Sequence, residues 1–333
     1  MPEISVILPF YNAQETLETA VISILKQSFT DFELLLINNN SVDKSIELAS
    51  KLAQKDNRIQ ILHEKKQGIV PALLKGLHYS TGQYIARMDA DDISLPNRFE
   101  LQHKLLENRQ DIGLVASCVK LFPAKTSNRG LCHYVNWQNQ ILTHEDILIK
   151  SFVESPVIHP SIMFRKKIAR KYGYYRDGDF PEDYELFLRW LHAGVKFSKI
   201  EKVLLHWRDK SNRLTRTYER YNKEAFFQTK LKYITKYIKH VNANYPEVYG
   251  WGAGQLAKKR RRILEYEGLK FKAIFEVDPA KIDNKEILHY SEIPERGDIF
   301  IVSLVSNKGA GEKIKKYLSF IDYVEGKDFI LTG

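Results

Sequence analysis

The sequence predicts an α/β protein built on a mostly parallel sheet, and two observations support this fold class. Short apolar runs alternate with segments whose apolar residues recur at helical spacing, and polar clusters follow several of these runs. The expected strands cover residues 4–8, 32–37, 59–62 and 84–88, and the expected helices cover residues 17–25, 46–53 and 69–79. This order of strands and helices favours parallel strands with helices on both faces of the sheet.

The length of 333 residues favours two domains. We expect a first domain over residues 1–211, a helical linker rich in basic and aromatic residues over 212–245, and a small Rossmann-like α/β domain over 246–333. Within the first domain a helix is expected at 181–193, whereas residues 121–150 hold few periodic signals. The aromatic residues of the linker can be buried between domains or can face a membrane surface, and both interpretations stay open.

The composition is typical of a globular protein, because 44% of the residues are hydrophobic and 28% are charged. No segment approaches the roughly 20 apolar residues that span a bilayer. The chain enters a strand soon after Met1, so no signal peptide is expected. Cys118 and Cys132 have no metal-binding spacing and are expected to be free thiols. Free thiols are typical of reducing compartments, which predicts a cytoplasmic location.

The formal net charge of +10 favours anionic partners, such as nucleotide diphosphates, acidic lipids and acidic glycans. The excess is concentrated late in the chain, for example at residues 258–262. No zinc-finger spacing and no RNA-binding signature accompany it, so we expect no nucleic-acid partner. Residues 212–262 are predicted to hold the protein near an anionic membrane or an anionic acceptor; the alternative is that these charges only solvate the surface.

An acidic sequence of Asp-x-Asp type, Asp89-Ala90-Asp91-Asp92, follows the apolar run at 84–88. Carboxylate oxygens are suitable ligands for magnesium or manganese. A divalent cation held there can neutralise the charge that grows on a diphosphate leaving group. Acidic loops are common, so this motif is weak evidence when taken alone. Polar clusters also follow the first two strands, at 9–11 and 38–40, and ligands of parallel sheets bind at that edge.

Four stretches, in order, resemble the motifs of inverting family 2 glycosyltransferases of the GT-A fold, and the resemblance covers about residues 3–210. The stretches are 5–12, similar to the opening strand with its Pro-x-Tyr-Asn turn; 38–43, similar to the nucleotide loop; 68–82 with 84–92, similar to the diphosphate and metal region; and 182–186, similar to the Glu-Asp motif of the acceptor-side helix. The resemblance implies that the predicted mostly parallel sheet is a GT-A sheet.

The resemblance also implies roles for individual residues. Asp89 and Asp91 would bind the metal and the diphosphate, and Asp183 would be the general base, with Glu182 beside it. An attacking hydroxyl must lose its proton, and a carboxylate within hydrogen-bond reach can accept it. Acids also favour a helix N-terminus for structural reasons, and the two roles are compatible. His206 is expected near the metal, and the other expected nucleotide contacts are Pro9, Tyr11, Asn38, Asn39, Asp43, Gly68 and Arg87.

Asn38 and Asn39 depart from the family pattern, which usually carries aspartates at these positions. An amide both donates and accepts hydrogen bonds, so it can still bind a base or a ribose. It lacks the charge that would strengthen those bonds. The identity of the nucleotide is therefore less constrained, although a UDP-linked donor is expected.

The function predicted from these motifs is inverting transfer of a sugar from a nucleotide diphosphate to a hydroxyl acceptor on a glycan or a lipid-linked molecule. The resemblance implies bacterial surface-glycan assembly at the cytoplasmic face of the membrane, with peripheral membrane contact. A nucleotidyltransferase would need a Gly-rich basic loop after the first strand, and residues 9–12 are not one. A non-catalytic sugar-nucleotide-binding scaffold, with the C-terminal domain as its working part, is the alternative.

The C-terminal domain resembles an accessory domain of some bacterial family 2 enzymes, and it contains a possible dinucleotide fingerprint. Gly252-Ala253-Gly254 is followed by Ala257 in place of the third glycine, and either Glu276 or Asp278 stands where a ribose-binding acid would. A tight turn between a strand and a helix also needs glycines for steric reasons alone. A docking or structural module is therefore the alternative to a dinucleotide site.

Overall fold

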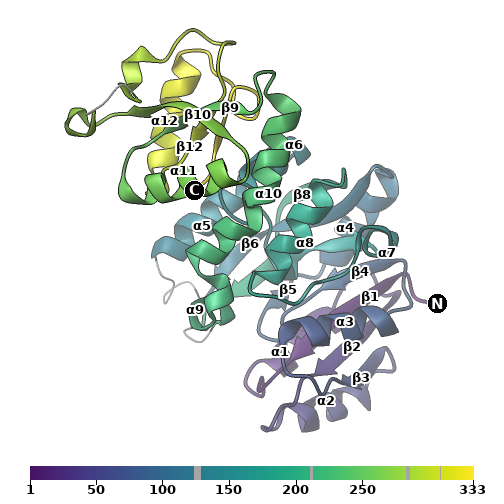
Figure 1. Ribbon diagram of the computed structural model, residues 1–333. Coiled ribbons are helices and arrows are strands. Elements are labelled where there is room, and N and C mark those ends of the chain that lie inside the picture. The colour runs from purple at the N-terminus through teal and green to yellow at the C-terminus, as the bar shows by residue number, and fades with distance from the viewer. Residues whose placement is uncertain (124–128, 211–212, 283–285, 308) are drawn as a thin grey trace. The chain divides into compact units, whose positions relative to one another are not determined.

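The computed structural model describes residues 1–123, 129–210, 213–282, 286–307 and 309–333 (Figure 1). They form two compact units. The first comprises residues 1–147 and 156–222, and the second comprises residues 148–155 and 223–333. The three-part division expected from the sequence stays a prediction, and its boundary between residues 211 and 212 lies outside the described residues.

The first unit contains a mixed sheet with the strand order β3-β2-β1-β4-β7-β6-β8-β5. Its strands are β1 (Ile4–Phe10), β2 (Phe32–Asn38), β3 (Ile59–His63), β4 (Tyr84–Arg87), β5 (Ile93–Ser94), β6 (Ile112–Phe122), β7 (Met163–Arg165) and β8 (Lys196–Arg208). Strand β7 runs antiparallel to β4 and β6, and β5 runs antiparallel to β8. The other neighbours are parallel, which confirms the predicted α/β class with a mostly parallel sheet.

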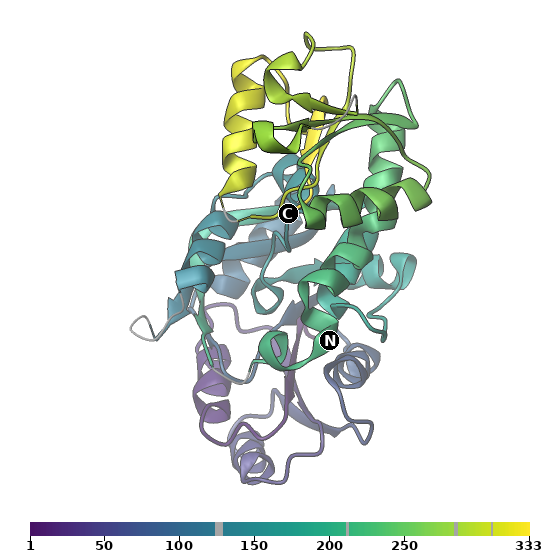
Figure 2. The same ribbon diagram turned by 60° about the vertical axis from the view of Figure 1, so that its left-hand side comes forward.

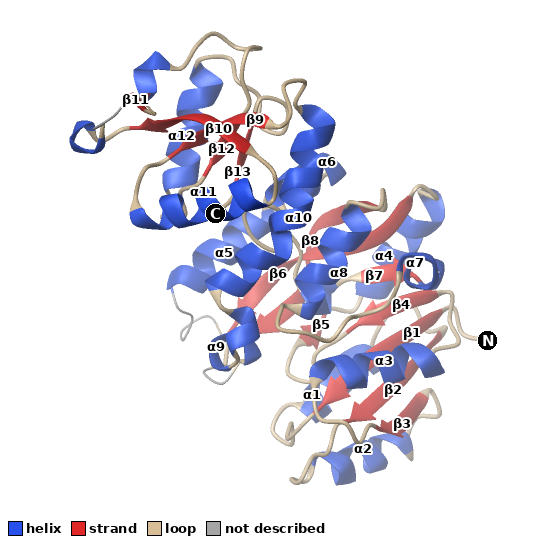
Figure 3. Ribbon diagram, viewed as in Figure 1, coloured by secondary structure: helices blue, strands red, loops and turns tan. Residues whose placement is uncertain are grey.

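Helices flank this sheet (Figure 3), and those of residues 1–222 follow in chain order, with the end of α6 belonging to the second unit. They are α1 (Leu17–Leu25), α2 (Ser45–Ala53), α3 (Ile69–Tyr79), α4 (Arg98–Asn108), α5 (Arg129–Asn139), α6 (His144–Lys150), α7 (Lys166–Tyr172), α8 (Glu182–Leu191) and α9 (Leu214–Thr217), with the 3-10 helices η2 (His159–Ser161) and η3 (Glu219–Tyr221). Helix α8 lies within the expected span 181–193. Helices α5 and α6 fall within residues 121–150, where the sequence holds few periodic signals, and few of their side chains are buried.

The central strands explain why the sequence shows continuous apolar runs. All seven residues of β1 are buried, as expected for a parallel strand covered on both faces. Phe10 of β1 lies opposite Asn38 of β2, and Ile7 lies opposite Arg87 of β4. The carboxyl ends of β1, β2 and β4 therefore meet at one edge of the sheet.

Helix α4 holds the end of β4 through a buried guanidinium. Arg98 donates from Nη2 to the carbonyl oxygens of Arg87, at 2.7 Å, and of Ile162, at 3.2 Å. Burial lowers the pKa of Arg98 to about 9. Gln102, one turn later, donates to the carbonyl of Ser161 at 2.7 Å. These bonds fix the backbone from which the acidic motif begins.

The second unit is a parallel sheet with the strand order β11-β10-β9-β12-β13, which confirms the predicted Rossmann-like fold of the C-terminal part. Its elements are α10 (Lys223–Val241), β9 (Glu247–Trp251), α11 (Gln255–Tyr266), β10 (Lys270–Glu276), η4 (Pro279–Lys281), β11 (Ile287–His289), η5 (Tyr290–Glu292), β12 (Ile301–Ser303), α12 (Ala310–Phe320) and β13 (Phe329–Leu331). Right-handed crossovers place α11 and α12 on opposite faces of this sheet (Figure 2).

The glycine turn of the second unit connects β9 to α11, as the fingerprint requires. Gly252 has φ +106°, a backbone conformation that favours glycine. The buried Glu276 accepts the N–H of Ala253 at 2.7 Å through Oε2 and the N–H of Val277 at 2.8 Å through Oε1. Glu276 therefore already uses both carboxylate oxygens in closing this turn, and dinucleotide binding stays a prediction.

Helix α10 packs its apolar side within the second unit. Phe227 is buried beneath the guanidinium of Arg260, whose Cζ lies 4.6 Å from the ring centroid. Lys230 donates from Nζ to the carbonyl oxygens of Phe152 and Val153, at 2.7 and 2.9 Å. The buried aromatic side of this helix is therefore part of a protein core and is not available to a membrane surface.

Across the described ranges, no helix combines the length and the apolar character needed to cross a membrane.

Candidate active site

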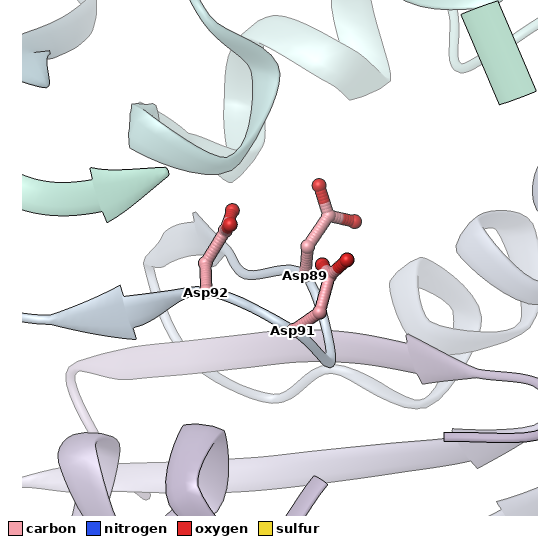
Figure 4. Close-up of side chains that lie close together, drawn as sticks. All are labelled: Asp89, Asp91 and Asp92. Atoms are coloured by element: carbon pink, nitrogen blue, oxygen red, sulfur yellow. The ribbon is translucent and has the colours of Figure 1, made fainter. Parts of the chain in front are cut away.

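Three carboxylates gather in the turn between β4 and β5. One oxygen from each of Asp89, Asp91 and Asp92 lies within 4.8 Å of the others. The side chains point to the same side of the turn (Figure 4). Such a set of hard oxygen ligands suits magnesium or manganese. We call these three residues the acid turn.

The acid turn carries more negative charge than its surroundings satisfy. Asp92 is 1% exposed, and its Oδ1 accepts the N–H of Arg208 at 2.8 Å, whereas its Oδ2 has no hydrogen-bond partner among the described residues. Burial and the charges of Asp89 and Asp91 raise the pKa of Asp92 well above its usual range. Burial and the charge of Asp89 also raise the pKa of Asp91. A bound cation would relieve this repulsion, so the residues present fit a divalent metal.

Basic side chains partly compensate the acid turn. The guanidinium Nη1 of Arg87 lies 2.6 Å from Asp89 Oδ1, and Lys210 Nζ lies 3.4 Å from Asp91 Oδ2. Burial lowers the pKa of Arg213, and the charges of the three aspartates oppose this shift. Two of these cations follow the end of β8, so two segments far apart in the sequence meet at the acid turn.

His206 lies on β8 opposite Ile93, outside the acid turn. Its ring stacks on Phe122, with the ring centroids 6.3 Å apart. Burial lowers the pKa of His206, which favours its neutral form. A neutral imidazole can bind a metal, but the group of potential ligands that the described residues bring together does not include it, and its predicted role at the metal stays untested.

A second pair of carboxylates begins helix α8. Glu182 is 4% exposed and accepts the hydroxyl of Tyr221 at 2.6 Å through Oε2. Burial, followed by the negative charge of Glu182, raises the pKa of Asp183 to about 7. Asp183 Oδ1 accepts the N–H of Tyr184 at 2.7 Å. A carboxylate that titrates near neutrality is well matched to the role of a general base.

Two buried side chains connect this pair to the acid turn. Burial alone would lower the pKa of Arg87, but the nearby Asp89 and Tyr175 raise it. The positive charge of Arg87 in turn lowers the pKa values of Glu182 and Asp183. Burial raises the pKa of Tyr175, and the charges of Asp183, Glu182 and Asp89 add to this effect. The two groups of carboxylates are therefore close enough to interact electrostatically through Arg87 and Tyr175.

His159 completes the buried part of this site. Its Nε2 lies 2.6 Å from the hydroxyl of Tyr175. Burial and the charge of Arg87 hold the pKa of His159 well below its usual range, so the imidazole is neutral. A neutral ring can fix the orientation of the tyrosine hydroxyl without adding charge.

The two asparagines at the end of β2 serve the loop that follows β3. Asn39 is 5% exposed, and its Nδ2 donates to the carbonyls of Glu64, at 3.1 Å, and of Lys66, at 2.8 Å. Its Oδ1 accepts the N–H of Gly68 at 2.8 Å. Only an amide can make this combination of bonds, since a carboxylate cannot donate. The departure from aspartate therefore has a structural cause at this position.

Asn38 retains more freedom than Asn39. Its Oδ1 accepts the N–H of Ser41 at 3.1 Å, and its Nδ2 lies 3.4 Å from Nδ1 of His63. These bonds leave one amide hydrogen and one lone pair of the buried Asn38 unused. Tyr11, at the end of the neighbouring strand, is 54% exposed and offers an aromatic face.

The remaining predicted nucleotide residues also lie at or near this sheet edge. Pro9 is buried in β1, and Gly68 precedes α3 with φ +132°. Asp43 accepts the backbone N–H groups of Gln14, at 3.1 Å, and Ser45, at 3.0 Å. Asp43 also lines a cavity of about 530 Å³, together with residues 12–16 and Lys210. Lys210, which lines this cavity, also approaches Asp91 of the acid turn.

Sequence reasoning missed several members of the site. Tyr175, Lys210 and Arg213 belong to no motif, and Tyr221 lies among the aromatic residues of the expected helical linker at 212–245. For Lys210 and Arg213, the sequence offers only scattered basic residues after β8 as a signal. The basic segment after β8 meets the acid turn across more than a hundred residues of sequence, as the bonds of Arg208 to Asp91 and Asp92 show. Sequence spacing could not reveal contacts of this length.

Comparison with known proteins identifies the family. The model of Glycosyl transferase family 2 matches residues 5–173. The chain belongs to this family. It is therefore a glycosyltransferase, which confirms the predicted enzyme class and the GT-A resemblance of the first unit.

Relatives of this glycosyltransferase include proteins of glycan biosynthesis. An uncharacterised glycosyltransferase of Methanocaldococcus jannaschii is 31% identical over 65% of this chain and 74% of its own. An O-antigen biosynthesis glycosyltransferase of Escherichia coli is 29% identical over 62% of this chain and 79% of its own. The crystal structure of Staphylococcus aureus TarS with UDP-GlcNAc has a similar fold, with a TM-score of 0.56 and 15% identity over 79% of this chain and 70% of that one.

We predict that Asn39→Asp destabilises the glycosyltransferase by about 1–3 kcal/mol, because a buried carboxylate would face two carbonyl oxygens without a proton to donate. Hydrogen exchange of residues 64–68 and the thermal unfolding midpoint measure the effect. Asn40→Asp is the matched control, since Asn40 is exposed and water can replace its bond to the carbonyl of Lys65. Equal midpoints for the wild type and Asn39→Asp would show that the hydrogen bonds of Asn39 to residues 64–68, which we call the Asn39 clamp, do not stabilise the fold.

Proposed function

We propose that this glycosyltransferase moves one sugar from a UDP-linked donor to a hydroxyl acceptor by a single displacement that inverts the anomeric centre. The observation that carries the proposal is the position of Asp183, a carboxyl group with its pKa raised to about 7, in the same site as the acid turn. Turnover of a panel of UDP-sugars in the presence of manganese tests it directly, and no turnover or hydrolysis of any of them would favour a non-catalytic scaffold.

The reaction would use Asp183 as the base. As the acceptor oxygen bonds to the anomeric carbon, the bond from that carbon to the diphosphate oxygen breaks and UDP leaves with the bonding electrons. The proton of the acceptor hydroxyl passes to Asp183. A base whose pKa lies near the working pH takes this proton most effectively.

The acid turn would hold the metal, through Asp89 and Asp91 and with His206 as a third predicted contact. Magnesium or manganese bound there would supply Lewis-acid neutralisation of the diphosphate. Lys210 and Arg213 add positive charge at the same place, which supports a diphosphate on this side of the site.

The nucleoside would lie at the carboxyl ends of β1 and β2. The exposed ring of Tyr11 can stack on a base, and the free amide hydrogen and lone pair of Asn38 can bind its edge or the ribose. Asn39 would contribute mainly by shaping the loop at 64–68. The UDP-GlcNAc bound to TarS, a protein of similar fold, supports a UDP-sugar as the first donor to test.

The acceptor would be a glycan or a lipid-linked molecule in surface-glycan assembly at the cytoplasmic face of a membrane. The O-antigen biosynthesis relative supports this setting. Peripheral contact with an anionic membrane would come from helix α11, where Lys258, Lys259 and Arg262 are exposed together with Tyr266. Since the aromatic side of α10 is buried, the proposed surface is narrower than the span 212–262 expected from the sequence.

We predict that Asp91→Ala abolishes transfer and weakens UDP binding mainly when manganese is present, because Asp91 is proposed to join the metal to the diphosphate. Calorimetric titration with UDP, with and without manganese, measures this. Asp111→Ala is the matched control, because Asp111 is an exposed aspartate immediately before β6, outside the site. Metal-independent turnover that survives Asp91→Ala would refute the assignment.

We predict that Asp183→Asn leaves donor affinity nearly unchanged but lowers turnover roughly 100-fold or more, the usual scale for loss of a general base. In the wild type, turnover should fall as the pH drops through about 7, because protonation removes the base form of Asp183. A pH–rate profile and donor titrations check both statements. Collapse of donor binding with normal residual turnover would make Asp183 a binding residue instead.

We predict that the enzyme sediments with anionic vesicles at low salt and is released at high salt, because exposed charges are screened beyond roughly 8–10 Å at physiological ionic strength. Each basic residue near an anionic bilayer contributes on the order of 1 kcal/mol, so Lys258→Ala/Arg262→Ala should weaken binding. Lys313→Ala/Lys316→Ala, on the exposed side of α12, is the matched control. Equal absence of binding to anionic and neutral vesicles would reject the membrane contact.

A further inference from the structure

The hydroxyl of Tyr221 contacts the proposed base pair but has no part in the reaction described above. It donates to Glu182 Oε2 at 2.6 Å, across 39 residues of sequence. Burial raises the pKa of Tyr221, and the charges of Glu182 and Asp183 raise it further. The phenol therefore keeps its proton over the working range of pH, and towards Glu182 it acts only as a donor.

The backbone around Tyr221 is anchored independently of this bond. Arg220, the preceding residue of η3, donates from Nη2 to Asp177 Oδ1 at 2.9 Å. Lys66 Nζ lies 3.5 Å from the other oxygen of Asp177. The Arg220–Asp177 pair ties η3 to the loop that precedes α8. Since this pair does not involve the phenol, loss of the Tyr221 hydroxyl alone should leave the ring in place.

Glu182 and Asp183 compete for protons, because two buried carboxylates side by side cannot both ionise without cost. Burial raises the pKa of Glu182, and the bond from Tyr221 opposes this, as do the charges of Arg220 and Arg87. Backbone N–H groups and the charge of Arg87 lower the pKa of Asp183, whereas no side-chain hydrogen bond from the described residues contributes to lowering it. The tyrosine hydroxyl is thus the main feature that distinguishes the two carboxylates.

Building on the proposed role of Asp183 as general base, we propose that Tyr221 is a positioning residue of the transfer reaction: its hydroxyl keeps the negative charge on Glu182 and so makes Asp183 the stronger proton acceptor of the pair. With the hydroxyl present, Glu182 loses its proton first. The charge on Glu182 then strengthens Asp183 as a base, and Asp183 is the carboxylate that meets the acceptor hydroxyl.

The variant Tyr221→Phe keeps the ring and removes the donor. A hydrogen bond to a charged group is worth about as much as one pH unit of pKa, so the acidic limb of the turnover–pH profile should move down by about one unit. Plateau turnover should fall roughly threefold, because a weaker base takes the proton less effectively. The measured reaction is turnover of whichever of UDP-glucose, UDP-galactose and UDP-GlcNAc the wild type uses fastest, and the KM of that donor should stay unchanged.

Tyr218→Phe is the matched control, because Tyr218 is 60% exposed on the same segment. Its pH profile should match the wild type. If Tyr221→Phe lowers turnover but leaves the acidic limb in place, or moves the limb to higher pH, Tyr221 has only a structural role and the proposal is overturned.

A second variant tests the same idea through the other partner. Glu182→Gln removes the charge that Tyr221 is proposed to hold, so it should also move the acidic limb down. Because both changes act through one charge, the combined variant Tyr221→Phe/Glu182→Gln should shift the limb no further than Glu182→Gln alone. Additive shifts would overturn the proposal.

Failure of the base assignment would be recognised separately. If Asp183→Asn keeps full turnover, Asp183 is not the base, whatever Tyr221→Phe does.

If Tyr221→Phe turns over too slowly for a pH profile, carboxyl NMR of enzyme labelled with ¹³C-aspartate measures the titration of Asp183 directly. The signal of Asp183 is assigned by its loss in Asp183→Asn. A fall of about one pH unit in the Asp183 midpoint is the expected result, and an unchanged midpoint would overturn the proposal.

Discussion

The positive charge of the buried Arg87 side chain is the constraint on which the arrangement of the site depends. It lies 2.6 Å from Asp89 and also lowers the pKa values of Glu182 and Asp183. A buried cation is costly unless acids surround it, and clustered acids are costly unless a cation is near. The charge of Arg87 therefore acts on both the turn after β4 and the start of α8, which couples the proposed metal side of the site to the proposed base.

The architecture that brings these groups together was largely predictable, because parallel strands must end at one edge of the sheet. The apolar runs that became β1, β2 and β4 are buried on both faces, so their sequence signal is strong and their ends were located within two residues. Helices α5 and α6 could not be predicted in the same way. Only Val135 and Gln138 of α5 and Ile147 of α6 are buried, so neither helix carries an extended apolar face that would mark it in the sequence.

The site was predictable where function resides in a short motif and not where it depends on contacts across the fold. Asp89, Asp91 and Asp183 could be selected from local sequence, but Asn39 could not be recognised as a clamp, because its partners are backbone groups 25 or more residues away. By its spacing in the sequence, Tyr221 belongs to the aromatic residues of the helical linker expected at 212–245. In the structure it ends η3, just before that helix begins, and this one-turn break directs its hydroxyl to Glu182.

The raised pKa values of the base pair also link function to stability. A carboxyl group whose pKa is higher in the folded than in the unfolded state destabilises the fold once the pH exceeds its unfolded value, and the penalty is complete above the folded pKa. For Asp183 that window runs from its usual value of 3.8 to about 7, so the enzyme bears the full cost at the pH where the base form exists. Hydrophobic burial along α8 offsets this cost, since Tyr184, Leu186, Phe187 and Leu188 are fully buried beside the charged turn. The apolar body of α8 therefore allows its acidic N-terminus to remain in a state that is unfavourable for folding and suitable for proton transfer.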